Sequence, residues 1–216
     1  MEQISEVRLE AIPSSNYIRP LRMHFKQEGK QRHWDLVDGH DSVSVLLVHL
    51  DRKALVLVRQ FRPTVFYALV TRGRRVEEVA EEEWRDVQKV KAAITYELPA
   101  GIVDKASKSL AELAAEEVLE ETGYRIAPHQ LSPINSYRAI GTGGNRGNIF
   151  YGVVRDADRV AEGGGVGDNE RLEVMHVGWS EVSALLKDES KIKPAGCLIG
   201  LQHFLFEKLP SLSKQQ

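Results

Sequence analysis

The sequence is poor in cysteine, in long apolar runs and in net charge. Cys197 is the single cysteine among 216 residues, so a disulfide within the chain is excluded. We expect its thiol to be buried as a small apolar group. No apolar run approaches the roughly 20 residues of a membrane-spanning helix. The net charge of -2 and the pI near 6.4 leave no basic excess, which argues against nucleic acid as a partner.

The first ten residues, "MEQISEVRLE", are polar and of mixed charge, unlike a secretory signal peptide. We therefore expect a soluble, cytoplasmic protein without a membrane partner. Hydrophobic residues make up 42% of the chain, which is enough for an ordinary core. The length predicts one domain with an additional arm.

Alternating and β-branched runs predict most of the strands. Residues 17–37 alternate around "QEGK" and predict an N-terminal β-hairpin, while 42–50 and 54–61 predict a second, more buried hairpin. Further strands are expected at 93–98, 134–140, 148–154 and 171–179. Residues 71–92 are strongly charged, which is typical of a surface insertion. Two shorter helices are expected near the C-terminus, one with Ser180 as its N-cap and one at 197–209. Strands combined with a few helices indicate a mixed α/β layered domain.

The stretch "AAEEVLEETGY" (114–124) carries four glutamates, although like charges spaced i,i+4 destabilise a helix. A helix is predicted over 109–122, because Ser109 and Glu112 fit a capping box and Gly123 is a natural stop. Its glutamates at 117, 120 and 121 would then share one side.

Grouped carboxylates suit a hard cation such as Mg²⁺ or Mn²⁺, which prefers oxygen ligands. Mg²⁺ often takes its remaining ligands from substrate phosphates, so the pattern points to phosphate chemistry. The alternative is a solvent-facing acidic stripe, which the spacing alone favours.

The flanking residues change this balance. The stretch "ELPAGIVDKASKSLAELAAEEVLEETGYRI" resembles the signature of the Nudix hydrolases, a glycine followed by a helix ending R-E-apolar-x-E-E-x-G-apolar. The resemblance implies an α/β/α sandwich with a mixed sheet. It also implies cleavage of nucleoside diphosphates linked to another group, with divalent cations bound by glutamates. The metal ligands would be Glu117, Glu120 and Glu121, with the carbonyl of Ala100 as a further ligand; Glu120 would also be needed for catalysis.

Three departures from the signature concern the same helix. Glu116 stands where the family has an arginine that pairs with neighbouring carboxylates. The segment between Gly101 and Glu116 is one residue longer than usual. The early signature glutamate would fall on Ser107 or Lys108. The added repulsion at Glu116 would weaken metal binding or require a cation from elsewhere.

The resemblance extends along most of the chain to the ADP-ribose and nucleotide-sugar branch of the family, through "RQFRP", "ELPAGIVD" and "IKPAGCLIGLQHFL". In that branch the arginine matching Arg62 lies at the substrate, and its planar fork suits a diphosphate. Glu97 would lie near the metals. Residues 1–40 would form an arm that joins a homodimer, and residues 41–216 the hydrolase domain, with the charged insertion at about 71–92.

Hydrolysis also needs a group that orients or activates water. The glycine-rich, acidic segment 162–170 resembles a late loop of this branch, and Glu170, followed by Asp168, is the candidate base. A plain acidic surface loop is the alternative. The segment "GTGGNRG" (141–147) lacks the lysine of a P-loop and precedes a strand, so neither a P-loop nor a dinucleotide motif fits. Arg146 within it is a candidate for phosphate or sugar contact.

The resemblance therefore implies a Mg²⁺-dependent enzyme that hydrolyses a UDP-sugar such as UDP-glucose to UMP and glucose 1-phosphate. ADP-ribose is the alternative substrate, because the sequence does not determine the base. A nucleotide-sugar binding protein with little turnover is the alternative of another class, favoured by Glu116.

Overall fold

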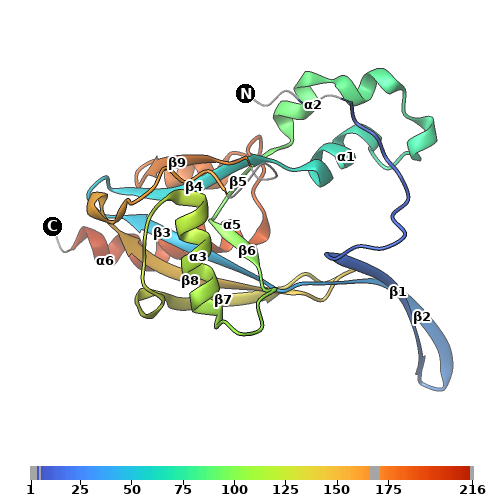
Figure 1. Ribbon diagram of the computed structural model, residues 1–216, viewed down its shortest axis with the longest axis horizontal. Coiled ribbons are helices and arrows are strands. Elements are labelled where there is room, and N and C mark those ends of the chain that lie inside the picture. The colour runs from blue at the N-terminus through green and yellow to red at the C-terminus, as the bar shows by residue number, and fades with distance from the viewer. Residues whose placement is uncertain (1–3, 5, 166–170, 215–216) are drawn as a thin grey trace.

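The structure is a computed structural model of the 216-residue chain, and it describes residue 4, residues 6–165 and residues 171–214. Strands and helices alternate irregularly along the chain (Figure 1). The strands of the described part are β1 (Ile18–Gln27), β2 (Lys30–Gly39), β3 (Ser42–His49), β4 (Ala54–Phe61), β5 (Ile94–Glu97), β6 (Ala100–Ile102), β7 (Ser132–Arg138), β8 (Arg146–Val154) and β9 (Glu173–Gly178). Its α-helices are α1 (Pro63–Thr71), α2 (Val87–Ala92), α3 (Leu110–Thr122), α4 (Val182–Lys187), α5 (Ala195–His203) and α6 (Leu209–Ser213).

Seven strands form one mixed sheet in the order β5-β4-β3-β8-β7, with β6 also paired to β3 and β9 to β4. β3 and β8 run parallel, from Ser42 beside Gly147 to His49 beside Val154. The remaining pairs are antiparallel. The sheet is therefore mixed, as the sequence predicted.

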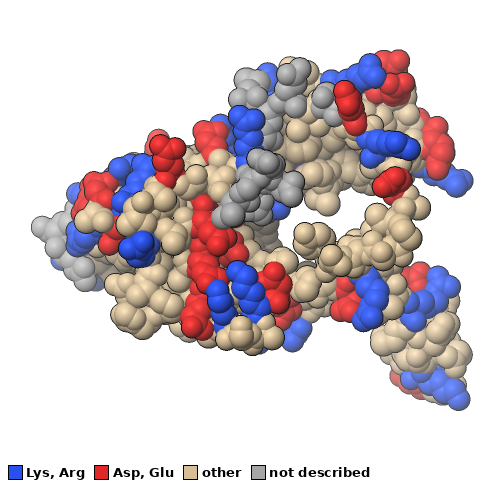
Figure 2. Space-filling view, viewed as in Figure 1, with Lys and Arg blue, Asp and Glu red and all other residues tan. Residues whose placement is uncertain are grey.

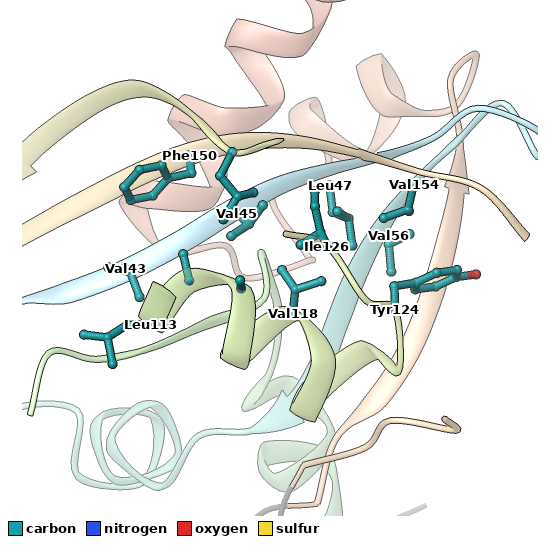
Figure 3. Packing of buried hydrophobic residues seen from close by; sticks show 13 residues of the cluster. Val43, Val45, Leu47, Val56, Leu113, Val118, Tyr124, Ile126, Phe150 and Val154 are labelled. Carbon is teal, nitrogen blue, oxygen red and sulfur yellow. The ribbon is translucent and has the colours of Figure 1, made fainter. Parts of the chain in front are cut away.

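Helices cover both faces of this sheet, and the side chains of β3 are therefore buried on both sides. Val43, Val45 and Leu47 pack toward α3, as Figure 3 shows. Leu46 and Val48 point the other way and pack with residues of α4 and α5. This confirms the α/β/α sandwich, and a strand that is apolar on both faces is what a central strand requires.

The buried stripe of α3 follows from its sequence. Leu113, Ala114 and Val118 are buried against the sheet. The predicted capping box is confirmed, because the N–H of Ser109 donates to the Glu112 carboxylate at 2.7 Å. Gly123 ends the helix with φ +74°, a conformation that glycine adopts without steric cost.

Residues 18–39 form an antiparallel hairpin that projects from the sandwich (Figure 1), as predicted. The register places Leu21 opposite Leu36 and Met23 opposite Trp34, so these four side chains share one face. Met23 and Trp34 are about half exposed, at 50% and 56%. One face of the hairpin is therefore apolar and largely open to solvent.

The charged stretch 71–92 belongs to a larger helical arm that begins at Pro63 and comprises residues 63–92 (Figure 1). The arm has a small core of its own, in which Phe66 and Val70 of α1 pack with Val90 of α2. Ion pairs cross its surface: Arg74 and Lys89 both bond to Glu83 and lower the pKa of that carboxyl to about 2.

Two of the predicted helices differ from the structure at their ends. The N-cap of α4 is Glu181 and not Ser180, because the Glu181 carboxylate accepts the N–H of Gly178 at 2.9 Å and closes the turn there. The last helix was predicted over 197–209. It begins two residues earlier at Ala195, changes to a π-helical turn at Phe204–Lys208 and continues as α6. Cys197 is buried, as predicted, and burial raises its pKa to about 12. No helix among the described residues is both long enough and apolar enough to span a bilayer.

One buried and one half-buried histidine contact Tyr124, which lies just after the Gly123 cap of α3. The Tyr124 hydroxyl lies 3.0 Å from Nε2 of His176, and His49 packs edge-on against Tyr124. Tyr124 and His49 are fully buried. Burial is the largest cause that lowers the pKa of both imidazoles, so both are neutral at pH 7.

These histidines predict a loss of stability in mild acid. An imidazole whose pKa is lower in the folded state takes up a proton on unfolding. Its contribution is complete above the ordinary pKa of about 6.5 and is lost as the pH falls below it, by up to about 1.4 kcal/mol per pH unit and group. The urea concentration at the midpoint of unfolding should therefore decrease when the pH is lowered from 7.5 to 5.5. His176→Gln should reduce the slope, and His24→Gln, in the exposed hairpin, should leave it unchanged. A flat profile for the unmodified chain would contradict the burial argument.

Candidate active site

A cavity opens where the sheet divides. β3 pairs with β6 through residues 42–44 and with β4 through residues 47–49, so its two partners diverge. The chain crosses from β5 to β6 through Leu98 and Pro99. A cavity with a volume of about 520 Å³ lies beside this crossing, and we call it the central cavity. Its described lining includes the polar side chains of Tyr17, Ser42, Ser44, Gln60, Arg62, Glu97, Asp104, Lys105, Glu117, Glu120, Glu121 and Tyr137.

The three signature glutamates of α3 reach this cavity at different depths. Glu121 is buried, and its Oε2 accepts the N–H of Ala100 at 3.0 Å. Glu117 is half-buried against the backbone of Gly101, where a Cβ atom would overlap with its carboxylate. Glu120 is exposed at the rim. Figure 2 shows the result as a band of acidic side chains over α3, with basic side chains beside it.

The C-terminal end of α3 is held by the segment that follows β8. The N–H of Gly164 donates to the carbonyl of Glu121 at 2.8 Å, and that of Gly165 to the carbonyl of Glu120 at 3.2 Å. Gly163 has φ +77°, and a Cβ there would overlap with the backbone of Thr122. These bonds satisfy carbonyls that a helix end leaves open, and they tie residues 163–165 to the signature glutamates.

Arg62 and Glu97 form a two-pronged ion pair at the cavity wall. Nε and Nη2 of Arg62 donate to the two carboxylate oxygens of Glu97 at 2.7 and 2.6 Å. Glu97 is buried, and Thr95 also donates to it. A buried carboxylate needs such partners, and the planar fork fixes the guanidinium in one orientation. Glu97 thus holds Arg62 in place, and its predicted role near the metals stays a prediction.

Glu116, which replaces the signature arginine, has two lysine partners. Lys105 donates to its Oε2 at 3.1 Å, and Lys108 bonds to its Oε1. Both lysines come from the segment between β6 and α3, and together they hold the pKa of Glu116 below its ordinary value. Of the two expected consequences of Glu116, weaker metal binding or a compensating cation from elsewhere, the structure shows compensating cations in this segment.

Comparison with known proteins gives full-length matches. The chain is 37% identical, over 100% of both chains, to a uridine diphosphate glucose pyrophosphatase of Bos taurus. It is 35% identical, over the same share, to the protein of that name from Mus musculus. A GDP-mannose pyrophosphatase of Cronobacter sakazakii is 27% identical and covers 78% of this chain and 75% of its own. No family model matches the sequence.

The chain belongs to the Nudix hydrolase family. Members of this family depend in general on divalent cations. The oxygen donors of this Nudix hydrolase suit such an ion, because five carboxylates and two cationic side chains line the described part of its central cavity. Within the described residues, no three carboxylate, imidazole or thiol groups are close enough to enclose an ion.

The structure brings most of the predicted site residues of this Nudix hydrolase into one cavity: Arg62, Glu97, Ala100 and the three glutamates. Arg146 is not part of that described lining. Its N–H donates to Asp41 and its Nε to Ser136. Asp168 and Glu170 lie outside the described residues, so their roles stay predictions.

Several lining residues were not singled out from the sequence. Asp104 and Lys105 lie inside the signature segment, and their position between Gly101 and the helix was a usable signal. Tyr137 of β7 and Gln60 of β4 had no comparable signal, because their approach to the cavity depends on strand pairing.

The close approach of Gly101 to Glu117 predicts a selective defect. In Gly101→Ala the new methyl group must displace the end of a flexible glutamate, so the fold should survive. Affinity for Mn²⁺, followed by its paramagnetic resonance signal, should fall by about tenfold or more. Gly144→Ala is the control, because a Cβ at that position meets nothing within 4 Å. Equal Mn²⁺ affinity in both variants would remove Glu117 from the metal site.

Proposed function

We propose that this chain hydrolyses the diphosphate of a UDP-sugar, with UDP-glucose giving UMP and glucose 1-phosphate, in the presence of Mg²⁺ or Mn²⁺. The observation that carries the proposal is the meeting of Arg62 with the glutamates of α3 in one cavity. The choice of substrate is supported by the similarity to UDP-glucose pyrophosphatases, which are 37% and 35% identical to this chain over its full length.

The acidic side chains and Arg62 have different proposed roles: the carboxylates would bind the cation, and the guanidinium would bind the diphosphate. Glu117 and Glu120, with Glu121 and the carbonyl of Ala100 behind them, would hold the cation, which supplies charge neutralisation for the diphosphate when bound. Arg62, oriented by Glu97, would fix the diphosphate by paired hydrogen bonds. Positioning and charge neutralisation supply most of the catalysis in phosphoryl transfer.

Water adds across the phosphoanhydride bond: its oxygen binds one phosphorus, the bridging oxygen leaves with the other, and the water gives up a proton. We assign Glu170, followed by Asp168, as the group that accepts this proton. The support comes from the ends of their segment. Gly165 donates to the carbonyl of Glu120, and the N–H of Leu172 donates to the carbonyl of Gly164 at 3.2 Å. The chain thus leaves and rejoins the described structure beside the glutamates.

The binding-protein alternative depended on an uncompensated Glu116. Two lysines pair with that carboxylate, so the feature that favoured little turnover has lost its basis. ADP-ribose and GDP-mannose are the alternative substrates, and the experiment below compares them with UDP-glucose.

Glu120→Gln tests the proposal directly. The amide keeps the size of the side chain and removes its charge, so turnover of UDP-glucose should fall by roughly 100-fold or more with the fold retained, since even residues that only support metal ligands contribute 10- to 100-fold. Release of UMP, AMP and GMP from UDP-glucose, ADP-ribose and GDP-mannose is measured by chromatography, with and without Mg²⁺. The control is Glu189→Gln, an exposed glutamate outside the central cavity.

Metal-dependent UMP release that exceeds the other two and is lost in Glu120→Gln supports the proposal. Faster AMP or GMP release would keep the site and change the substrate. Full activity of Glu120→Gln would remove the glutamates from the mechanism.

We also infer that the chain forms a homodimer through its N-terminal hairpin. The support is the exposed apolar face of Leu21, Met23 and Trp34 on a two-stranded ribbon. An isolated two-stranded hairpin is marginally stable in water, and covering this face would stabilise it.

A charge on that face should separate the protomers. Met23→Asp should elute as a monomer in size-exclusion chromatography with light scattering, because an unpaired carboxylate in an apolar interface is costly. Lys26→Asp should leave the mass unchanged, because Lys26 lies on the opposite face of the ribbon. The same mass for both variants would exclude this face as the interface.

A further inference from the structure

We propose that Lys105 is a substrate-binding residue: it leaves Glu116 when the diphosphate enters and bonds to a phosphate oxygen. This inference rests on the proposed function, because it concerns the same site and a diphosphate ligand.

Two lysines hold Glu116, and only one of them belongs to the central cavity. Lys105 bonds to Oε2 of Glu116 at 3.1 Å and lines the cavity with Glu117 and Glu120. Lys108 bonds to the other oxygen and lines a groove on the outer side of α3, with Glu112 and Arg125. The two side chains therefore share a partner and face different ligands.

The charges of the cavity favour Lys105 as the movable cation. Within its described lining the cationic side chains are Arg62 and Lys105. Two donors of Arg62 are engaged in a fixed fork with buried Glu97. The Lys105 side chain is 47% exposed, and its four-carbon stem lets the ammonium reach a range of positions. An exposed ion pair contributes little stability, so Lys105 can exchange one anion for another readily.

Glu116 does not lose its compensation in this exchange. When Lys105 moves, Lys108 still bonds to the same carboxylate. A dianionic diphosphate is a stronger partner for an ammonium than a single shared carboxylate, because hydrogen bonds between two charged groups gain from each added charge. The pair of lysines thus lets one cation leave while the other keeps Glu116 in place beside the metal-site glutamates.

The test compares Lys105→Met with Lys108→Met, which each remove one of the two partners of Glu116. Steady-state kinetics with UDP-glucose and Mg²⁺ should show a KM raised by about tenfold or more in Lys105→Met, the size expected for one charge-assisted hydrogen bond. KM should stay within about twofold in Lys108→Met. Lys105→Arg keeps the charge and should recover most of the affinity. Binding of UMP without metal, measured by calorimetry, should weaken in Lys105→Met alone.

Equal KM values in the two methionine variants would overturn the proposal, because they would show that Lys105 acts only through Glu116. Unmodified protein that fails to release UMP would contradict the proposed function and not this inference. In that case the dissociation constant for UDP-glucose replaces KM, and the same comparison between the two variants decides. Lys105→Gln provides a second neutral variant if Lys105→Met does not fold.

Discussion

The hydrogen bond from the Ala100 N–H to the buried Glu121 carboxylate joins the helix of the signature to the sheet. A buried carboxylate without a donor is costly, so the bond fixes α3 at one height along β6. Glu117 and Glu120 take their positions from that placement, since they are one turn or less away on the same helix. The backbone of Gly101 then leaves the space that the Glu117 carboxylate occupies.

The other charged residues of the cavity are connected to this hydrogen bond through short segments of backbone. Glu97 and Ala100 lie on either side of the Leu98–Pro99 crossing, so Arg62 and the glutamates are held at neighbouring points of one backbone. At the same C-terminal end of α3, residues 164 and 165 also donate to the carbonyls of Glu121 and Glu120. The C-terminal end of the helix, which carries Glu120 and Glu121, is therefore held both by the sheet and by the segment after β8.

What the sequence could predict follows from how local each signal is. The capping box of Ser109, the stop at Gly123 and the apolar stripe of α3 depend on residues within a few positions of one another, and all three are confirmed. The pairing of Arg62 with Glu97 joins residues 35 positions apart through strand pairing, and no local pattern contains it. The same holds for the two lysines on Glu116, whose reach depends on how the segment after β6 folds back. The prediction of Ser180 as the N-cap of α4 was wrong. Ser180 and Glu181 are both plausible caps from the sequence, and the preceding turn at Gly178 decides between them.

The parallel pairing of β3 with β8 has a consequence for the order of events during synthesis. The paired residues, such as Val43 and Asn148, lie far apart in the sequence, with β4, β5, β6 and β7 between them. A ribosome must release β8 before β3 gains its second neighbour, and closing so long a loop is slow. Until then an apolar strand with an open edge is exposed to other chains, which is a hazard for aggregation. Assembly of the central cavity is thus a late step in folding, and the yield of active protein depends on how well β3 is shielded while the chain waits for β8.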